Sequence, residues 1–506
     1  MLGLVLLALP AACGADDAPL GPSQPRPVVF VPGEVHPDGT ISVHHERELR
    51  GAWVSTVYNG TWPSRTGLTE SAAKAELIGI FDALAGARMN VVFFQVRAES
   101  DAFYASTLEP WSRFLTGTQG QDPGWDPLTF AVEEGHRRGL EVHAWLNPYR
   151  ALVDARITPA ASHVTNTLAT ATRAYGTQRW MDPGAPEVRA HVMNVVRDIV
   201  ARYDVDGIHF DDYFYPYPIS GETFDDAATF AAHETAGGAL TRDDWRRSNV
   251  DALIRETADV VAATRADVRF GVSPFGIYRP GMPEGITGLD AWATLFCDPV
   301  RWMQEGWVDY VAPQLYWPTT QRAQAFGKLA EWWAGLATER RSVFIGHDAT
   351  KAGEAKYPLD EYDAQMTVAY EQRARGVRGS IFFSAKPLVS DQAGLRTALV
   401  AEHWKLPAAP PPLATASAHT GEDPPRVAWV TSDAIEIMGE GRSAAIYRER
   451  EASDAAADSA SPRYVLERLV PLLQGRARLE LDRGSWVVTR ISRVGGESRG
   501  VRVSRE

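Results

Sequence analysis

The chain has 506 residues, 45% of them hydrophobic and 23% charged, which excludes a largely disordered protein and allows one large domain plus a smaller one. The formal net charge of −13 argues against a nucleic-acid partner, because binding to phosphate backbones depends on clustered Lys and Arg, and no basic stripe is present. Sixteen Trp and sixteen Tyr residues suit stacking on sugar rings, and they serve equally well in a hydrophobic core.

The N-terminus has the pattern of a bacterial export signal. Residues 1–12 form an apolar run that is too short to span a bilayer but suits the core of a signal peptide. Ala11 and Ala12, directly before Cys13, resemble a lipoprotein cleavage site with Cys13 as the lipidated residue. A plain secretory signal is the alternative, because Pro10 stands where a lipobox usually has Leu. We expect an exported lipoprotein that faces the periplasm or the cell exterior and contacts the membrane only through its N-terminal lipid.

Residues 14–46 are expected to form a flexible tether, because they are rich in Pro, Gly and Asp and show no sustained period. Between residues 47 and 405, short apolar runs then alternate eight times with amphipathic stretches. Most of the runs are continuous, which is typical of strands buried on both faces of a parallel sheet. The predicted strands are Leu49–Ser55, Asn90–Arg97, Glu141–Pro148, Val205–Asp212, Arg269–Gly276, Val308–Trp317, Ser342–Asp348 and Gly379–Ala385.

Helical patterns lie between these strands, with local start and stop signals. At one start, Asp126 is a capping residue before Pro127, and Gly139 ends the same helix. Eight strand–helix units with long insertions after the second, third and fourth strands predict a (β/α)8 TIM barrel; an open doubly wound sheet is the alternative. The predicted helices include Ser71–Ala87, Asp126–Arg138, Pro186–Tyr203, Asp243–Thr264 and Leu359–Arg375.

The composition changes after the barrel. Residues 406–425 begin with a Pro-rich stretch and continue with Thr, Ser and Ala, which is typical of a linker. Residues 426–506 contain short apolar runs separated by Gly, Asp and Ser turns, the pattern of a small β-sandwich. This segment carries no visible catalytic cluster, so we interpret it as a fibronectin-like accessory module that acts as a spacer or binds glycans.

The predicted strand ends are polar, and the catalytic groups of a TIM barrel stand at the carboxyl ends of its strands. Carboxylates, amides, Arg and aromatic rings on one rim are what a sugar site needs. The expected partner is therefore a polysaccharide or other glycan. The residues predicted to bind it are Arg97, Asp101, Tyr104, Trp145, Asn147, Tyr149, Arg150, His209, Tyr213, Gln314, Tyr316 and Trp317.

The strongest local signal is the segment from Asp206 to Tyr213, with sequence DGIHFDDY. Period-two alternation places His209 and Asp211 on one face of the strand, so Asp211 should point to the mouth of the barrel while Asp212 begins the loop. Adjacent carboxyls beside a buried strand tend to divide into a protonated and an ionised group, as acid–base catalysis requires. In the structural alternative, Asp212 caps the loop and Asp211 binds a neighbouring Arg or Tyr.

A series of distinctive segments lies in unbroken order over residues 47–405. The segments are LRGAWV from Leu49, QVR from Gln95, PWS from Pro110, LTG from Leu115, HAWLNPYR from His143, DGIHFDDYF from Asp206, DWRR from Asp244, GVSP from Gly271 and APQLYWP from Ala312. Together they resemble the bacterial glycosyl-hydrolase-like family ten. The resemblance implies a TIM-barrel glycosidase, often an envelope lipoprotein, for which peptidoglycan glycan strands are a candidate substrate in Gram-negative relatives.

Two related patterns assign roles to the carboxyl groups. Amylase-type barrels carry a nucleophilic Asp two residues after an Arg on the fourth strand, and Asp211 follows His209 with that spacing. Asp211 is thus the expected nucleophile or principal carboxylate. The same segment also resembles the catalytic strand of chitinases, which ends in a Glu. Tyr213 stands at the position of that Glu, which argues against substrate-assisted catalysis. Asp212 is the first candidate for the partner acid; the others are Glu99, Asp101 and Asp226.

No cofactor or metal is expected, because His136, His143 and His209 lack the spacing of a zinc site. Two other functions stay open. A glycan-binding envelope protein without a competent acid pair would use the same aromatic groups, and a metal-dependent deacetylase would use the same barrel. The sequence leaves open the sugar, the linkage, the stereochemical outcome and the oligomeric state.

Overall fold

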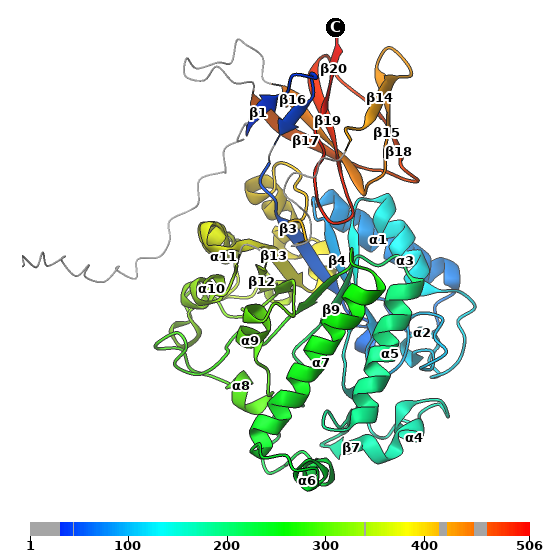
Figure 1. Ribbon diagram of the computed structural model, residues 1–506, viewed down its shortest axis with the longest axis vertical. Coiled ribbons are helices and arrows are strands. Elements are labelled where there is room, and N and C mark those ends of the chain that lie inside the picture. The colour runs from blue at the N-terminus through cyan, green and yellow to red at the C-terminus, as the bar shows by residue number, and fades with distance from the viewer. Residues whose placement is uncertain (1–30, 44, 339–340, 414–422, 450–462) are drawn as a thin grey trace, which may run out of the picture.

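The computed structural model describes residues 31–43, 45–338, 341–413, 423–449 and 463–506, so the predicted signal peptide with Cys13 and residues 14–30 of the predicted tether lie outside the described residues. Eight parallel strands close into a barrel, which confirms the predicted TIM barrel and excludes an open sheet (Figure 1). In barrel order the strands are β3 (Leu49–Val54), β4 (Val91–Arg97), β5 (Glu141–Leu146), β9 (Gly207–Phe210), β10 (Arg269–Val272), β11 (Tyr310–Val311), β12 (Ser342–Asp348) and β13 (Val377–Phe383).

Helices surround the barrel, and local capping fixes where several of them begin. The Asp126 side chain accepts a hydrogen bond from Thr129 N at the start of α3, and Pro127 takes the first helical position, as predicted. Within the described part of the chain, no helix is long and apolar enough to cross a bilayer. The longer helices are α1 (Glu70–Gly86), α3 (Pro127–Arg137), α5 (Pro186–Arg202), α6 (Ala227–Thr235), α7 (Arg242–Thr264), α10 (Phe326–Ala334) and α11 (Leu359–Glu371).

Insertions enlarge the carboxyl end of the barrel. A three-stranded sheet of β6 (Arg150–Leu152), β8 (Gln178–Met181) and β7 (Thr172–Tyr175) follows β5, and helix α6 follows β9. Figure 1 shows β7 and α6 at the bottom of the molecule, far from the C-terminal strands at the top. The carboxyl ends of the barrel strands therefore face this lower end.

Side chains of the barrel strands alternate between two cores. On β9, Ile208 and Phe210 join the large core between barrel and helices. His209 points to the barrel interior, where its ring centroid lies 4.7 Å from that of Phe93 and 6.0 Å from that of Tyr310. This arrangement confirms the alternation predicted for the fourth strand.

The C-terminal residues form the predicted β-sandwich, called here the module. Its two sheets enclose a core that includes Ile435, Ile446 and Trp486. The six-stranded sheet has the order β2-β1-β17-β16-β19-β20 and the three-stranded sheet β14-β15-β18. These strands are β1 (Val31–Val35), β2 (Ile41–Val43), β14 (Arg426–Trp429), β15 (Ala434–Met438), β16 (Ser443–Glu449), β17 (Arg463–Pro471), β18 (Arg476–Glu480), β19 (Gly484–Ile491) and β20 (Val501–Arg505).

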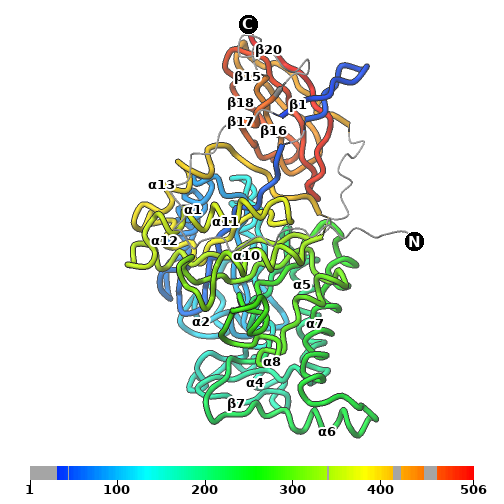
Figure 2. The backbone as a smooth tube through the Cα atoms, turned by 90° about the vertical axis from the view of Figure 1, so that its left-hand side faces the viewer, coloured from blue at the N-terminus to red at the C-terminus, as the bar shows by residue number. Residues whose placement is uncertain are grey.

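Residues 31–43, which the sequence placed in the tether, belong to this module. Strand β1 pairs with β17, and β2 adds Ile41 and Val43 to a second buried cluster that also contains Tyr447. Figure 2 shows this N-terminal segment beside the C-terminal strands. The prediction of a tether was wrong here, because two strands this short have too few residues to show a period and their pairing partners lie at the other end of the chain.

The first part of the predicted linker packs against the amino ends of the barrel strands. Arg50 Nη1 donates to Leu406 O at 2.8 Å, Asn90 Nδ2 to Ala408 O at 2.7 Å and Arg269 Nη2 to Pro411 O at 2.5 Å. A Pro-rich segment has few N–H groups but keeps its carbonyl oxygens, so it suits a surface of donors. Residues 406–411 therefore cover the amino-terminal opening of the barrel instead of acting as a free spacer.

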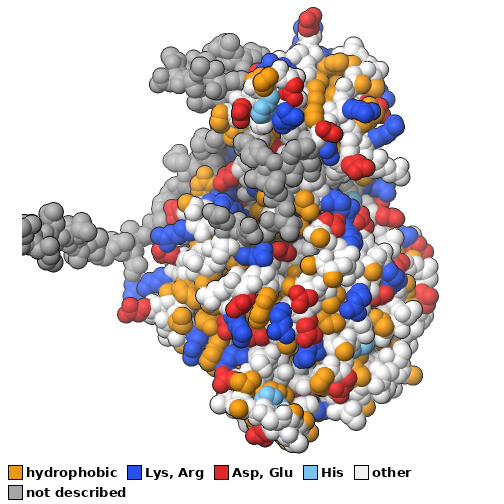
Figure 3. Space-filling model, in the orientation of Figure 1, with side chains coloured by type: hydrophobic (Ala, Val, Ile, Leu, Met, Phe, Trp, Pro, Cys, Tyr) orange, Lys and Arg blue, Asp and Glu red, His pale blue; other side chains and the backbone are white. Residues whose placement is uncertain are grey.

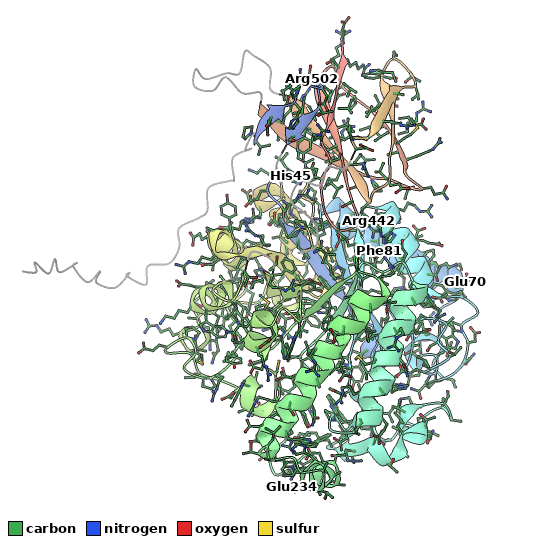
Figure 4. All side chains as sticks on the ribbon, in the orientation of Figure 1. His45, Glu70, Phe81, Glu234, Arg442 and Arg502 are labelled. Atoms are coloured by element: carbon green, nitrogen blue, oxygen red, sulfur yellow. The ribbon has the colours of Figure 1, made fainter. Side chains whose placement is uncertain are left out.

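The module docks at the same amino-terminal side. Arg442, labelled at the junction in Figure 4, forms an ion pair with Asp206, which precedes β9. Arg493 Nε lies 2.7 Å from Asp267 Oδ2, and Arg442 Nη1 lies 2.7 Å from His136 Nε2. The module thus leaves the carboxyl ends of the barrel strands uncovered. On the face shown in Figure 3, acidic and basic side chains are intermixed, without a broad patch of either sign.

Candidate active site

Two adjacent carboxyl groups stand at the carboxyl end of the fourth barrel strand. Asp211 and Asp212 directly follow β9, and their exposed fractions are 5% and 2%. A buried carboxylate loses hydration energy, so it needs hydrogen-bond donors or a proton. The neighbouring side chains determine whether each carboxyl group is stabilised by hydrogen-bond donors or carries a proton.

Asp211 receives two N–H donors on one oxygen. Trp145 Nε1 donates to Asp211 Oδ2 at 3.2 Å, and Asn147 Nδ2 donates to the same oxygen. Gln95 Nε2 donates to Asn147 Oδ1 at 2.7 Å, so the amide of Asn147 is itself held in place. The ends of β4, β5 and β9 thus meet at one carboxyl group.

Asp212 has hydrogen-bond partners that differ from those of Asp211. The hydroxyl group of Tyr217 donates to Asp212 Oδ2. Burial raises the pKa of Asp212, while hydrogen bonds from Tyr217 and Gln314 lower it. Gln314 also donates through Nε2 to Ser273 O at 3.0 Å, which ties this contact to the end of β10.

The charges of the pair are coupled. Burial and the repulsion by Asp212 raise the pKa of Asp211 to about 7, and the positive charge of Arg150 acts against this rise. The two carboxyls can therefore share one proton near neutral pH, with one protonated and one ionised. This state is the one that acid–base chemistry at a glycosidic bond requires.

Partly exposed aromatic rings form a line beside the pair, called here the aromatic strip. Tyr213 and Tyr217 have ring centroids 5.5 Å apart, Tyr217 and Phe275 6.2 Å, and Phe275 and Trp317 5.6 Å. The guanidinium carbon of Arg150 lies 5.1 Å from the centroid of Tyr213. The strip connects the ends of β9, β10 and β11 with apolar ring surface that remains accessible.

The end of β11 contributes further groups. Gln314, Tyr316 and Trp317 are all partly exposed, and the ring of Tyr316 stacks on Phe383 at 6.0 Å. The structure therefore brings together seven predicted binding residues around the pair. They are Trp145, Asn147, Arg150, Tyr213, Gln314, Tyr316 and Trp317.

Arg97 does not fit the predicted role in substrate binding. Its side chain is fully buried and forms an ion pair with Glu109 at 2.6 Å. It also donates to Pro148 O at 3.1 Å and to Ser100 Oγ at 3.1 Å. Its guanidinium group is thus used to hold the loops after β4 and β5.

Besides Arg97 and Asn147, four predicted binding residues have no exposed surface. His209 lies inside the barrel, where it accepts a hydrogen bond from Trp53 Nε1 at 3.1 Å and lies 3.1 Å from the hydroxyl group of Tyr310. The structure does not bring these side chains to the carboxyl pair as it brings Asn147, and their predicted role in binding stays a prediction. The four residues are Asp101, Tyr104, Tyr149 and His209.

The other candidate acids have protein partners. Both oxygens of Glu99 are occupied, one by Arg113 Nε at 2.6 Å and the other by Val153 N at 3.0 Å. Burial and the neighbouring Asp101 raise the pKa of Glu99 to about 7. Asp226 forms ion pairs with Arg242 and Arg246. These contacts give Asp226 a structural role and leave Asp212 as the partner adjacent to Asp211.

Sequence reasoning missed three residues of the site. Gln95 stands two positions before Arg97 and has the position at the rim that was expected for Arg97. Tyr217 and Phe275 lie in loops, and no local pattern shows that their rings turn back to the pair. In the described part of the chain, no group of three or more His, Cys, Asp or Glu side chains is arranged to hold a metal ion.

A closed parallel barrel with paired carboxyls, amides and aromatic rings at its carboxyl edge has the architecture of a TIM-barrel glycoside hydrolase. Residues 48–363 match the family described as Glycosyl hydrolase-like 10. The chain belongs to this family and is a glycoside hydrolase, which confirms the predicted resemblance.

Two relatives and one solved structure are similar to this chain. The chain is 37% identical over 405 residues to glycosyl hydrolase YngK of Bacillus subtilis, covering 77% of this chain and 78% of that one. It is 34% identical over 376 residues to glycosyl hydrolase DigH of Escherichia coli K12, covering 69% and 83%. The glycoside hydrolase domain of PgaB (BpsB) from Bordetella bronchiseptica is 12% identical, with a TM-score of 0.48 over 70% of this chain and 98% of that domain.

Proposed function

We propose that this enzyme hydrolyses glycosidic bonds of a cell-envelope glycan, with Asp211 and Asp212 as the reacting carboxyl groups. The observation that carries the proposal is the buried, adjacent pair itself, in which the pKa of Asp211 is raised to about 7. A glycosidase needs one carboxyl group to protonate the leaving oxygen and a second to act as base or nucleophile. The coupled pair offers both states in the same pH range.

The charges favour Asp211 as the acid and Asp212 as the base or nucleophile. The negative charge of Asp212 raises the pKa of Asp211, and the hydroxyl group of Tyr217 stabilises Asp212 in its ionised form. This division reverses the roles expected from the amylase-like spacing. We adopt it because spacing along a strand says nothing about the donors that surround each carboxyl group.

The aromatic strip supports a carbohydrate chain as the substrate. Aromatic faces pack against the C–H surfaces of sugar rings, while Arg150 and Gln314 can bind hydroxyl groups. The strip continues from the pair past Phe275 to Trp317, so it offers room for sugars beyond the one that is cleaved. Peptidoglycan glycan strands are the first substrate to test, because the N-terminal pattern predicts an envelope location.

The experiment compares products from glycan strands with and without attached peptides and from storage polysaccharides, using residues 14–506 and mass spectrometry of new reducing ends. Asp211→Asn and Asp212→Asn should both abolish cleavage of natural strands. An aryl glycoside with a good leaving group needs little protonation, so it should restore much of the rate in Asp211→Asn alone. Rescue of Asp212→Asn alone would return the roles to the order expected from the sequence.

Glu99→Gln is the matched control, because Glu99 is equally buried and its pKa is also raised to about 7. It should keep most of the activity. Inactivity of Glu99→Gln with activity in Asp211→Asn would move the acid to Glu99. Saturable binding of glycan strands without new reducing ends in the unmodified enzyme would instead support a glycan-binding protein and contradict the proposed hydrolysis.

The location at the envelope is a separate proposal with its own test. Cys13 should incorporate labelled palmitate in the producing bacterium, and Cys13→Ser should not. Export without incorporation would support the plain secretory signal.

A further inference from the structure

A chain of hydrogen bonds leads from two backbone amides to Asp211. Thr56 N and Val57 N donate to Gln95 Oε1 at 2.8 and 2.9 Å. Backbone N–H groups can only donate, so the oxygen of the Gln95 amide must face them. The nitrogen of Gln95 then donates to Asn147 Oδ1, and the nitrogen of Asn147 donates to Asp211 Oδ2.

This chain has only one consistent direction. Reversing the Gln95 amide would place its NH2 group against two backbone N–H groups, which is excluded because Thr56, Gln95 and Asn147 are buried. Trp145 Nε1, the second partner of Asp211 Oδ2, is also only a donor. Asp211 Oδ2 therefore faces two groups that cannot accept a proton.

We infer that Gln95 is a positioning residue, which turns the Asn147 amide so that Asp211 can carry its proton only on Oδ1. This inference rests on the proposed role of Asp211 as the acid. Oδ1 has one contact, a long one of 3.4 Å from Tyr213 N, so it is the oxygen left to meet a substrate. The same donors oppose the effect of burial and limit how far the pKa of Asp211 rises.

The charged and titratable groups around Asp211 come from several elements. Asp212 and Tyr213 belong to its own loop, Arg150 comes from β6, and Tyr217 and Tyr316 come from the loops after β9 and β11. None of them contacts Gln95 in the hydrogen bonds described here. A substitution at Gln95 should therefore reach Asp211 through Asn147, and this route can be tested.

The test follows the indole N–H signal of Trp145 by NMR in protein labelled with 15N-tryptophan, with the signal assigned through Trp145→Phe. Because this N–H donates to Asp211, its shift should titrate with Asp211 whether or not the enzyme cleaves any glycan. Failure of the proposed function would thus leave this measurement valid. Gln95→Met removes the positioning amide without adding charge. The midpoint of the Trp145 N–H titration should then rise by about one pH unit, a tenfold change in the acidity of Asp211.

Gln95→Glu distinguishes orientation from simple repulsion. The new carboxylate should turn Asn147 so that its oxygen faces Asp211 Oδ2, which raises the midpoint further because Oδ2 then needs the proton. In the Asn147→Ala background this rise should disappear if Gln95 acts only through Asn147. A rise that persists there would show direct charge repulsion and overturn the inference, as would an unchanged midpoint in folded Gln95→Met.

Asn90→Ala is the matched control for Asn147→Ala. Asn90 is also a buried asparagine that binds backbone carbonyls, but it lies at the amino end of β4. Its loss should lower stability and leave the midpoint of the Trp145 signal unchanged. If Asn90→Ala shifted the midpoint as much as Asn147→Ala does, both shifts would reflect a general loss of stability of the barrel. That result would contradict the inference.

Discussion

At the scale of single residues, the burial of Asp211 should make stability depend on pH. Its pKa in the folded enzyme, about 7, lies above the usual value of about 4 for an unfolded chain. The folded state therefore binds the proton more tightly, so this contribution to stability is present below pH 4 and is lost as pH rises through 7.

We predict that Asp211→Asn unfolds at a higher temperature than the unmodified enzyme at pH 8 and at a similar temperature at pH 4. The gain at pH 8 should be at most about 4 kcal/mol, since one pKa unit corresponds to about 1.4 kcal/mol. The Asn oxygen can still accept the hydrogen bonds from Trp145 and Asn147. Thermal unfolding across this pH range measures the difference, and an equal gain at both pH values would contradict the raised pKa.

A second prediction concerns Arg97, which the sequence suggested as a binding residue. Arg97→Ala leaves Glu109 buried without its ion-pair partner, so it should lower the free energy of unfolding by about 3–5 kcal/mol. Chemical denaturation measures this loss. Normal stability with a raised KM for the glycan would instead restore the role in binding.

The fate of these residues shows what alternation can predict. It correctly placed His209 on one face of a regular strand and Ile208 and Phe210 on the other. Arg97 was predicted instead from its position at a strand end, and there the pairing between β4 and β5 shifts register between Gln95 and Arg97. Such an irregularity depends on the neighbouring strand, so the local sequence does not reveal which of the two polar residues reaches the rim.

At the scale of elements, all eight barrel strands were predictable from continuous apolar runs, but their ends were less so. The sixth strand was expected to extend over Val308–Trp317, and only Tyr310–Val311 is regular. Pro313 lacks the N–H group that would continue the ladder. Beyond it, Gln314 forms only isolated bridges with Phe275 and Gly346, and Gln314, Tyr316 and Trp317 are partly exposed at the site.

The end of this element should contribute binding more than chemistry. Trp317 packs on Phe275 at the far end of the aromatic strip, away from the carboxyl pair. Trp317→Ala should raise KM for long glycans about tenfold with little change in kcat, since stacking on one ring contributes on the order of 1 kcal/mol. Steady-state kinetics on long and short substrates separates the two parameters. An effect on stability alone would assign Trp317 to the core.

At the scale of the whole molecule, the sequence predicted that residues 406–425 are a linker between the barrel and an accessory module. The structure argues otherwise, because residues 406–411 accept hydrogen bonds from the amino ends of β3, β4 and β10. A chain ending at Pro407 would lose most of these acceptors and leave Asp206 without Arg442. We predict that this truncated protein is insoluble or unfolds at least 10 °C lower, by roughly the 2–4 °C per kcal/mol of large domains.

Arg442→Ala is the milder test of the same idea. It breaks one buried ion pair and should lower the melting temperature while leaving the enzyme folded. Limited proteolysis should then release the module more readily. A truncated barrel with the full melting temperature would show that the two parts are independent and contradict the predicted loss.

The pairing of Val31 with Tyr464 also determines when the module can complete its folding during synthesis. The first strand of the module emerges from the ribosome about 430 residues before its partner, which at about 5–20 residues per second is a delay of roughly 20–90 s. Throughout that interval, Ile41 and Val43 lack the neighbouring strands of their own sheet whose side chains bury them. Nascent chains of this enzyme should therefore expose an unpaired strand edge early and depend on holding chaperones until the last eighty residues appear.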